Sequence, residues 1–131
     1  MSEGTVLLVE DNPRNLKLAR DVLEFAGFAV TVATTGEEAV TEATRNVPDL
    51  ILMDLQLPGI SGHTALARLR DDPRTAGIPI VALTAFAMSA DRDRALSTGF
   101  DGYLEKPISV REFPEQVRAH LRAGRLGGPG G

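Results

Sequence analysis

Short apolar runs alternate with helix-like segments five times along this chain of 131 residues. The first, third and fourth runs are almost entirely apolar, as strands covered on both faces of a parallel sheet require, whereas the second and fifth are weaker, as edge strands are. Strict alternation of strands and helices favours parallel strands with right-handed crossovers and helices on both faces. The pattern therefore predicts a doubly wound α/β domain with five helices and with strands at Thr5–Val9, Ala29–Ala33, Asp49–Met53, Pro79–Leu83 and Gly102–Leu104.

The expected helices carry their own start signals. Asn12 before Pro13 combines an N-cap residue with proline at the first helical position. Capping-box patterns and capping serines mark the other starts, at Thr35–Glu38, Ser109–Glu112, Ser61 and Ser89.

The last helix contains an irregularity. Its buried stripe is predicted at Val110, Phe113, Val117 and Leu121. Pro114 would be the fifth residue of a helix that starts after Ser109, where it removes a backbone hydrogen bond and crowds the preceding turn. We therefore expect a distorted first turn or a later start.

Composition excludes several classes of protein. The chain has no cysteine, so neither disulfides nor thiolate chemistry is possible. Its net charge is −4 with no basic stripe, which argues against a nucleic-acid partner. No apolar run approaches the ~18 residues that span a bilayer, and the first residues, MSEGT, do not resemble a signal peptide. We expect a cytoplasmic domain over residues 1–123 that makes no membrane contact, followed by a flexible glycine-rich tail over 124–131.

Each central apolar run ends in polar residues. Glu10 and Asp11 follow the first run, Asp54 follows the third, Thr84 follows the fourth, and Lys106 lies two residues after the fifth. The carboxyl ends of parallel strands lie along one edge of a sheet, where ligands bind. Three carboxylates, one hydroxyl and one ammonium are therefore expected to converge.

This combination points to magnesium-dependent phosphoryl chemistry. Asp54, directly after four apolar residues, requires either a strand that ends there in a polar pocket or a cationic partner. Three neighbouring carboxylates repel, and without a cation one should take up a proton. Mg²⁺ suits such an oxygen-rich site. Asp54, which would lie beside both the metal ion and Lys106, is the expected nucleophile. Taken alone, Glu10 and Asp11 are more typical of a charged helix start, and Asp54 is as typical of a solvated turn as of a site.

Four stretches, VLLVEDN, LILMDLQLPGISG, IPIVALTAFAM and GYLEKPIS, resemble in order the diagnostic stretches of the receiver domain of two-component response regulators. The resemblance covers about residues 5–123. It implies a flavodoxin-like fold with strand order 2-1-3-4-5. Within the family, the segments VEDNPRN, ALTAFAM and KPISV look most like those of single-domain cell-cycle regulators, and similar sequences also occur in receivers attached to hybrid histidine kinases.

The resemblance implies a role for each matching position. Asp54 would accept a phosphoryl group from a sensor histidine kinase or a histidine phosphotransfer protein. Lys106 would pair with that group and Thr84 would donate a hydrogen bond to it, while Tyr103 would change rotamer as Thr84 moves. A cis peptide is implied at Lys106–Pro107. The implied Mg²⁺ ligands are Asp11, Asp54, the backbone carbonyl of Gln56 and, through water, Glu10.

The resemblance also implies a signalling switch rather than an enzyme, one that assists its own phosphorylation and dephosphorylation and acts on a downstream protein target. Gln56 and Phe86 occupy the positions where this family tunes phosphate lifetime. Because Phe86 is apolar and cannot orient an attacking water, slow dephosphorylation is expected. Pro114 lies in the helix that carries part of the family's output surface, which puts partner docking there in question.

Three other interpretations remain open from the sequence. The chain could be a receiver cut from a hybrid histidine kinase or a multidomain regulator, although Met1 close before the first strand favours a natural start. It could be a phosphohydrolase of the haloacid dehalogenase type, but Gln56 stands where such enzymes carry a second acid. It could bind a flavin, but no glycine-rich phosphate loop follows the first strand.

Overall fold

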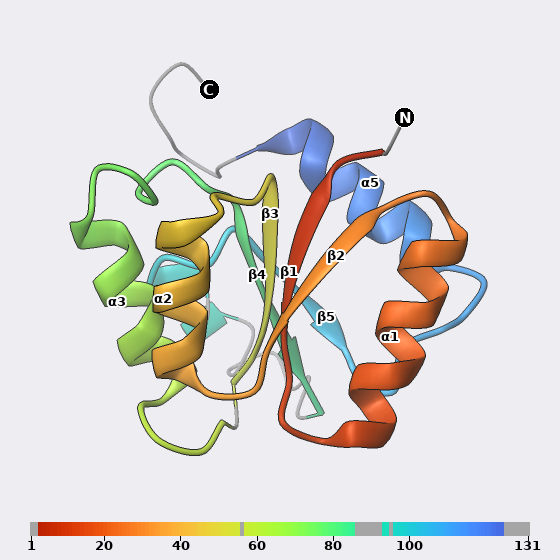
Figure 1. Cartoon of the computed structure of the whole chain (residues 1–131), viewed down its shortest axis with the longest axis horizontal. Helices are drawn as coiled ribbons and strands as arrows, with labels where there is room; N and C mark the ends of the chain where they lie inside the picture. The colour runs from red at the N-terminus through yellow and green to blue at the C-terminus, as the bar shows by residue number, and fades with distance from the viewer. Residues whose placement is uncertain (1–2, 56, 86–92, 95, 125–131) are drawn as a thin grey trace.

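Five parallel strands form a single sheet between two layers of helices in the computed structural model (Figure 1). The structure describes residues 3–55, 57–85, 93–94 and 96–124. The strand order is β2-β1-β3-β4-β5, as predicted. The elements are β1 (Thr5–Val9), α1 (Pro13–Phe25), β2 (Ala29–Ala33), α2 (Gly36–Arg45), β3 (Leu50–Asp54), α3 (Gly62–Asp71), β4 (Ile80–Thr84), β5 (Gly102–Glu105) and α5 (Phe113–Ala123).

Within the described residues there are four of the five predicted helices. The expected fourth helix, with its cap at Ser89, falls largely on residues 86–92 and 95, which lie outside the described part, although residues 93–94 and 96–97 are helical. Of the predicted tail, Gly124 alone is described. None of the helices that the structure describes is long and apolar enough to cross a membrane.

Alternate residues of the central strands serve two hydrophobic cores. Leu7 and Ile51 face the core covered by α2 and α3, whereas Leu8 and Leu52 face the core covered by α1 and α5. All four are fully buried. This explains why β1 and β3 are continuous apolar runs, since neither face of these strands meets water.

Strands β3 and β4 end one residue later than the sequence predicts. Asp54 pairs in register with Leu83, and Thr84 pairs with Glu105. A polar residue was expected to terminate each strand, but the parallel ladder continues through both. Asp54 and Thr84 are therefore the last residues of buried strands, and the sheet fixes the positions of their backbones.

The predicted helix caps at Asn12, Thr35 and Ser61 are confirmed, whereas Ser109 does not cap α5, whose N-cap position is Glu112. The Asn12 side chain accepts hydrogen bonds from the backbone amides of Arg14 and Asn15 at the start of α1. The Thr35 hydroxyl accepts one from the amide of Glu38 at 3.0 Å, and the Ser61 hydroxyl accepts one from the amide of Thr64 at 3.1 Å. These caps fix the first turns of α1, α2 and α3 beside the C-terminal edge of the sheet.

Helix α5 has the later start that Pro114 was expected to cause. It begins at Phe113, so that Pro114 lies in the first turn, where its missing amide costs nothing. Ser109 closes the preceding turn by accepting from the amides of Glu112 and Phe113. The prediction that Val110 belongs to the buried stripe is wrong: the residue is 59% exposed because it lies in this turn, outside the helical period.

Candidate functional site

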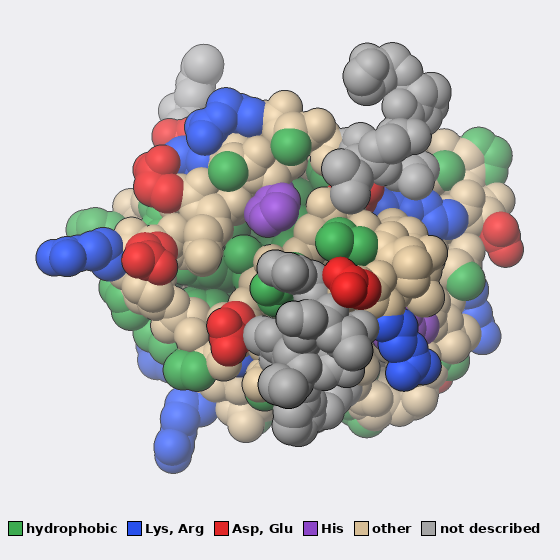
Figure 2. Space-filling view, turned by 180° about the vertical axis from the view of Figure 1, so that it is seen from behind, with side chains coloured by type: hydrophobic (Ala, Val, Ile, Leu, Met, Phe, Trp, Pro, Cys, Tyr) green, Lys and Arg blue, Asp and Glu red, His purple; other side chains and the backbone are tan. Residues whose placement is uncertain are grey.

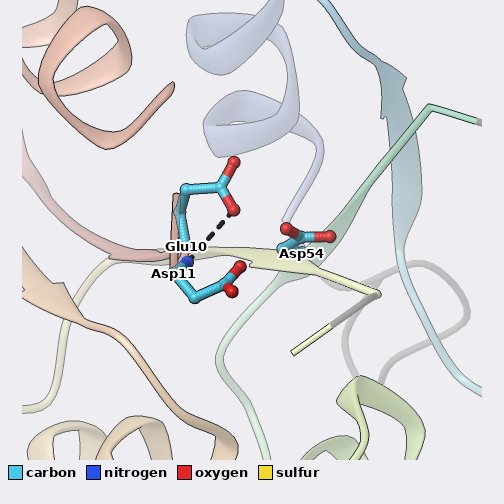
Figure 3. Close-up of side chains that lie close together, drawn as sticks. All are labelled: Glu10, Asp11 and Asp54. Carbon is cyan, nitrogen blue, oxygen red and sulfur yellow. Dashed lines mark hydrogen bonds between the residues drawn. The ribbon is translucent and has the colours of Figure 1, made fainter. Parts of the chain in front are cut away.

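The C-terminal ends of β1 and β3 bring three of the predicted site residues together. Glu10, Asp11 and Asp54 each offer a carboxylate oxygen, and these oxygens lie within 4.8 Å of one another (Figure 3). Glu10 and Asp54 are buried, whereas Asp11 is exposed at the mouth of the cluster. The Asp11 amide donates a hydrogen bond of 3.1 Å to the Glu10 carboxylate, which links the two neighbouring acids.

Lys106 supplies the cation that buried Asp54 requires. Its Nζ lies 2.8 Å from Asp54 Oδ2 and 3.0 Å from Glu10 Oε1, and its side chain is 17% exposed. The backbone amide of Lys106 donates to the Thr84 carbonyl at 2.8 Å, which fastens β5 to the end of β4. The Lys106–Pro107 peptide is cis, as the family resemblance implied.

The electrostatics of the cluster favour a bound proton or a metal ion. Burial, together with the hydrogen bond and the charge of Asp54, raises the pKa of Glu10 from 4.5 to about 7, although Lys106 opposes the shift. Burial alone would lower the pKa of Lys106, but its hydrogen bonds to Asp54 and Glu10 outweigh burial and raise it. The shift at Glu10 agrees with the expectation that one acid takes up a proton when no cation is bound.

The oxygen donors fit Mg²⁺. This ion prefers hard oxygen ligands such as these carboxylates, whose mutual repulsion it would relieve. One of the three is exposed, which leaves room for water and phosphate. Glu10, Asp11 and Asp54 could therefore hold it, with Lys106 beside the same group of acids.

We expect the stabilising effect of Mg²⁺ to grow as pH rises from about 5 to about 7. In the metal-free protein the folded state binds a proton on Glu10 more tightly than the unfolded state does, so its free energy of unfolding falls as pH rises through this window. Mg²⁺ must displace that proton, so it binds less well at the acid end. Thermal unfolding with Mg²⁺ and with EDTA at several pH values measures the difference. Glu10→Gln should flatten its pH dependence, and a difference that is the same at every pH would contradict the prediction.

The remaining predicted residues are placed as follows. Thr84 is buried at the end of β4, next to exposed Ala85. Tyr103 lies on β5, partly buried against the core under α2 and α3, and pairs in register with Ala82. Gln56 and Phe86 lie outside the described residues.

Comparison with known proteins identifies the same family that the sequence motifs resemble. The sequence profile of the response regulator receiver domain matches residues 6–118. The polar-differentiation response regulator DivK of Brucella ovis is 44% identical over 117 residues, which are 89% of this chain and 95% of the relative.

Two solved structures extend the comparison. The receiver domain of a sensor histidine kinase from Pseudomonas aeruginosa PAO1, solved with a magnesium ion coordinated in its active site cleft, is 36% identical, with a TM-score of 0.83 over 91% of this chain and 98% of that one. The chemotaxis response regulator CheY4 of Vibrio cholerae, at 24% identity, shares the fold with a TM-score of 0.84, over 92% of this chain and 98% of that one. From the match over residues 6–118 and the DivK similarity over most of its length, we conclude that this chain belongs to the family of response regulator receiver domains.

Proposed function

We propose that this chain is a phosphorelay response regulator that accepts a phosphoryl group on Asp54 in a Mg²⁺-dependent reaction. The donor is the phosphohistidine of a sensor histidine kinase or of a histidine phosphotransfer protein. The observation that carries the proposal is a buried Asp54 carboxylate, held 2.8 Å from Lys106 and within 4.8 Å of the oxygens of two further acids.

In the proposed reaction an Asp54 carboxylate oxygen attacks phosphorus. A phosphorus–oxygen bond forms as the phosphorus–nitrogen bond of the donor breaks, and the imidazole leaves with the electron pair. Lys106 orients the nucleophile beforehand and afterwards pairs with the transferred group. A magnesium ion held by Asp11, Asp54 and the Gln56 carbonyl, and by Glu10 through water, would offset negative charge on the attacking acid and on the phosphoryl oxygens.

Phosphorylation then acts as a switch. The new group adds negative charge and acceptor oxygens at Asp54, on the strand next to Thr84. The Thr84 hydroxyl donates a hydrogen bond to it and moves toward it, and Tyr103 on β5 takes up the space that Thr84 leaves. The pull amounts to a few hydrogen bonds, so the two states differ by little and a downstream protein can select one of them.

The proposed partners are proteins in the cytoplasm. On the face shown in Figure 2, acidic and basic side chains are interspersed among the coloured residues, with no continuous basic surface there for nucleic acid. A receiver module cut from a hybrid histidine kinase or a multidomain regulator is the alternative; the 44% identity to DivK and the 36% identity to a kinase receiver domain favour neither.

Incubation with acetyl phosphate tests this function against that of a phosphohydrolase. We expect stable, stoichiometric labelling with Mg²⁺, none with EDTA, and slow loss of the label after the donor is removed. Sustained turnover of several phosphoesters would support a hydrolase instead. Profiling of purified histidine kinases and phosphotransfer proteins would then identify the donor.

A further inference from the structure

The loop that follows Asp54 is clamped to the first turn of α2. This loop, described at residues 55 and 57–61, leads from the phosphoacceptor to α3. The Ile60 amide donates a hydrogen bond of 3.2 Å to the Glu37 carboxylate. Gly36 allows the close approach, since a Cβ there would lie 2.6 Å from the Ile60 carbonyl oxygen. We call this set, Gly36 and Glu37 against Gly59 and Ile60, the α2–loop contact.

Gly59 is adapted to the same contact. Its φ of +75° lies in the left-handed region that favours glycine, and a Cβ there would overlap the Glu37 carboxylate. The backbone position of Glu37 is fixed as well, because the Thr35 hydroxyl caps the first turn of α2 through the Glu38 amide. The Glu37 carboxylate thus lies close to Gly59 and accepts a hydrogen bond from the next residue, Ile60.

One end of the loop is tied to β4 and the other packs on Asp54. The Leu55 amide donates to the Leu83 carbonyl at 3.1 Å, on the neighbouring strand. At the other end, Gly62 packs so closely on Asp54 that a Cβ would lie 3.0 Å from the Asp54 carbonyl oxygen. Because both ends are fixed, a displacement of Gly59 or Ile60 must change the backbone between Leu55 and Gly62. This is the segment that directly follows Asp54.

We propose that Glu37 is a positioning residue for phosphorylation: it holds the loop after Asp54, through the Ile60 amide, in the position that Mg²⁺ binding and phosphoryl transfer require. The inference rests on the proposed function. A metal site needs its ligands held to within about 0.5 Å, and supporting hydrogen bonds provide that precision. Within the described part of the chain Glu37 bonds the Ile60 amide and not Lys106 or an acid of the site, so it acts through the loop backbone.

The simplest alternative is that Glu37 merely favours its helix, as an acid in the first turn does. Glu37→Gln separates the two roles, because glutamine loses the charge but keeps a side-chain oxygen that can accept from the Ile60 amide. Glu37→Ala removes both the charge and the acceptor. Glu42→Ala is the matched control: it removes the same charge from α2 at a residue bonded to Asn46 instead of the loop.

The test compares the Mg²⁺ dissociation constant and the rate of labelling by acetyl phosphate in the full chain. We expect Glu37→Ala to weaken Mg²⁺ binding and slow labelling by about fivefold, the size of one modest hydrogen bond, with Glu37→Gln and Glu42→Ala close to wild type. Wild-type values for Glu37→Ala would overturn this inference alone, as would a Glu37→Gln variant as impaired as Glu37→Ala. A wild-type protein that takes no label would overturn the proposed function together with it.

Discussion

Replacing Asp54 by asparagine should abolish labelling by acetyl phosphate and by any cognate phosphohistidine donor. The amide keeps the shape of the side chain but is not a nucleophile toward phosphorus at neutral pH. It also removes one of the three acids that gather at the end of the sheet, so Mg²⁺ should bind more weakly. Labelling with radioactive phosphoryl donor measures the first effect, and calorimetric titration with Mg²⁺ measures the second.

The variant should fold. Without the charge of Asp54, the pKa of Glu10 loses two of the causes that raise it, so Glu10 can ionise near neutral pH and retain Lys106 as its partner. The melting temperature without Mg²⁺ should therefore stay near that of the wild type. Asp71→Asn, which removes an exposed carboxylate at the end of α3, is the control and should label normally. Labelling that persists in Asp54→Asn would show that the acceptor is another residue.

Most of the site follows from topology, and this is why the sequence could predict it. In a parallel sheet the residues that follow each strand must meet at one edge, whatever the loops do. Glu10, Asp54 and Lys106 are separated by dozens of residues, yet the order β2-β1-β3-β4-β5 brings them within hydrogen-bond distance. Asp54 belongs to the strand, since the ladder pairs its backbone with β4 while Lys106 satisfies a carboxylate that an apolar run alone could not accommodate.

Contacts that depend on loop geometry were beyond the sequence. The spacing of Val110 in the sequence fits a helical period, but Pro114 delays the start of α5 and leaves Val110 exposed. Glu37 looks like an ordinary first-turn acid, and its contact with Ile60 exists because Gly36 and Gly59 permit a close approach between segments more than twenty residues apart. A glycine at each side of such a contact is the one signal that the sequence offered.

A buried ion pair at the opposite edge of the sheet also escaped prediction. Arg70, near the end of α3, lies 2.6 Å from Asp101, just before β5, and their side chains are 15% and 2% exposed. The guanidinium also donates to three backbone carbonyls, at 2.6–3.3 Å, which belong to Ala76, Ile78 and Gly99. Asp101 in turn accepts a hydrogen bond from the Ile80 amide at 2.8 Å. In the segment LARLRDD, Arg70 has the same appearance as Arg68, which is exposed.

Arg70→Met should therefore lower the free energy of unfolding by about 3–5 kcal/mol, because it leaves a buried carboxylate without its cation. Asp101→Asn should cost less, about 1–3 kcal/mol, since the amide oxygen still accepts from Ile80 and Arg70 keeps its carbonyl partners. If the pair acts as a unit, the double variant will lose less than the sum of the two single losses. Urea unfolding measures all three, with Arg68→Met, expected within about 0.5 kcal/mol of wild type, as the control. A loss for Arg70→Met no larger than that of Arg68→Met would show that solvent, and not Arg70, satisfies Asp101.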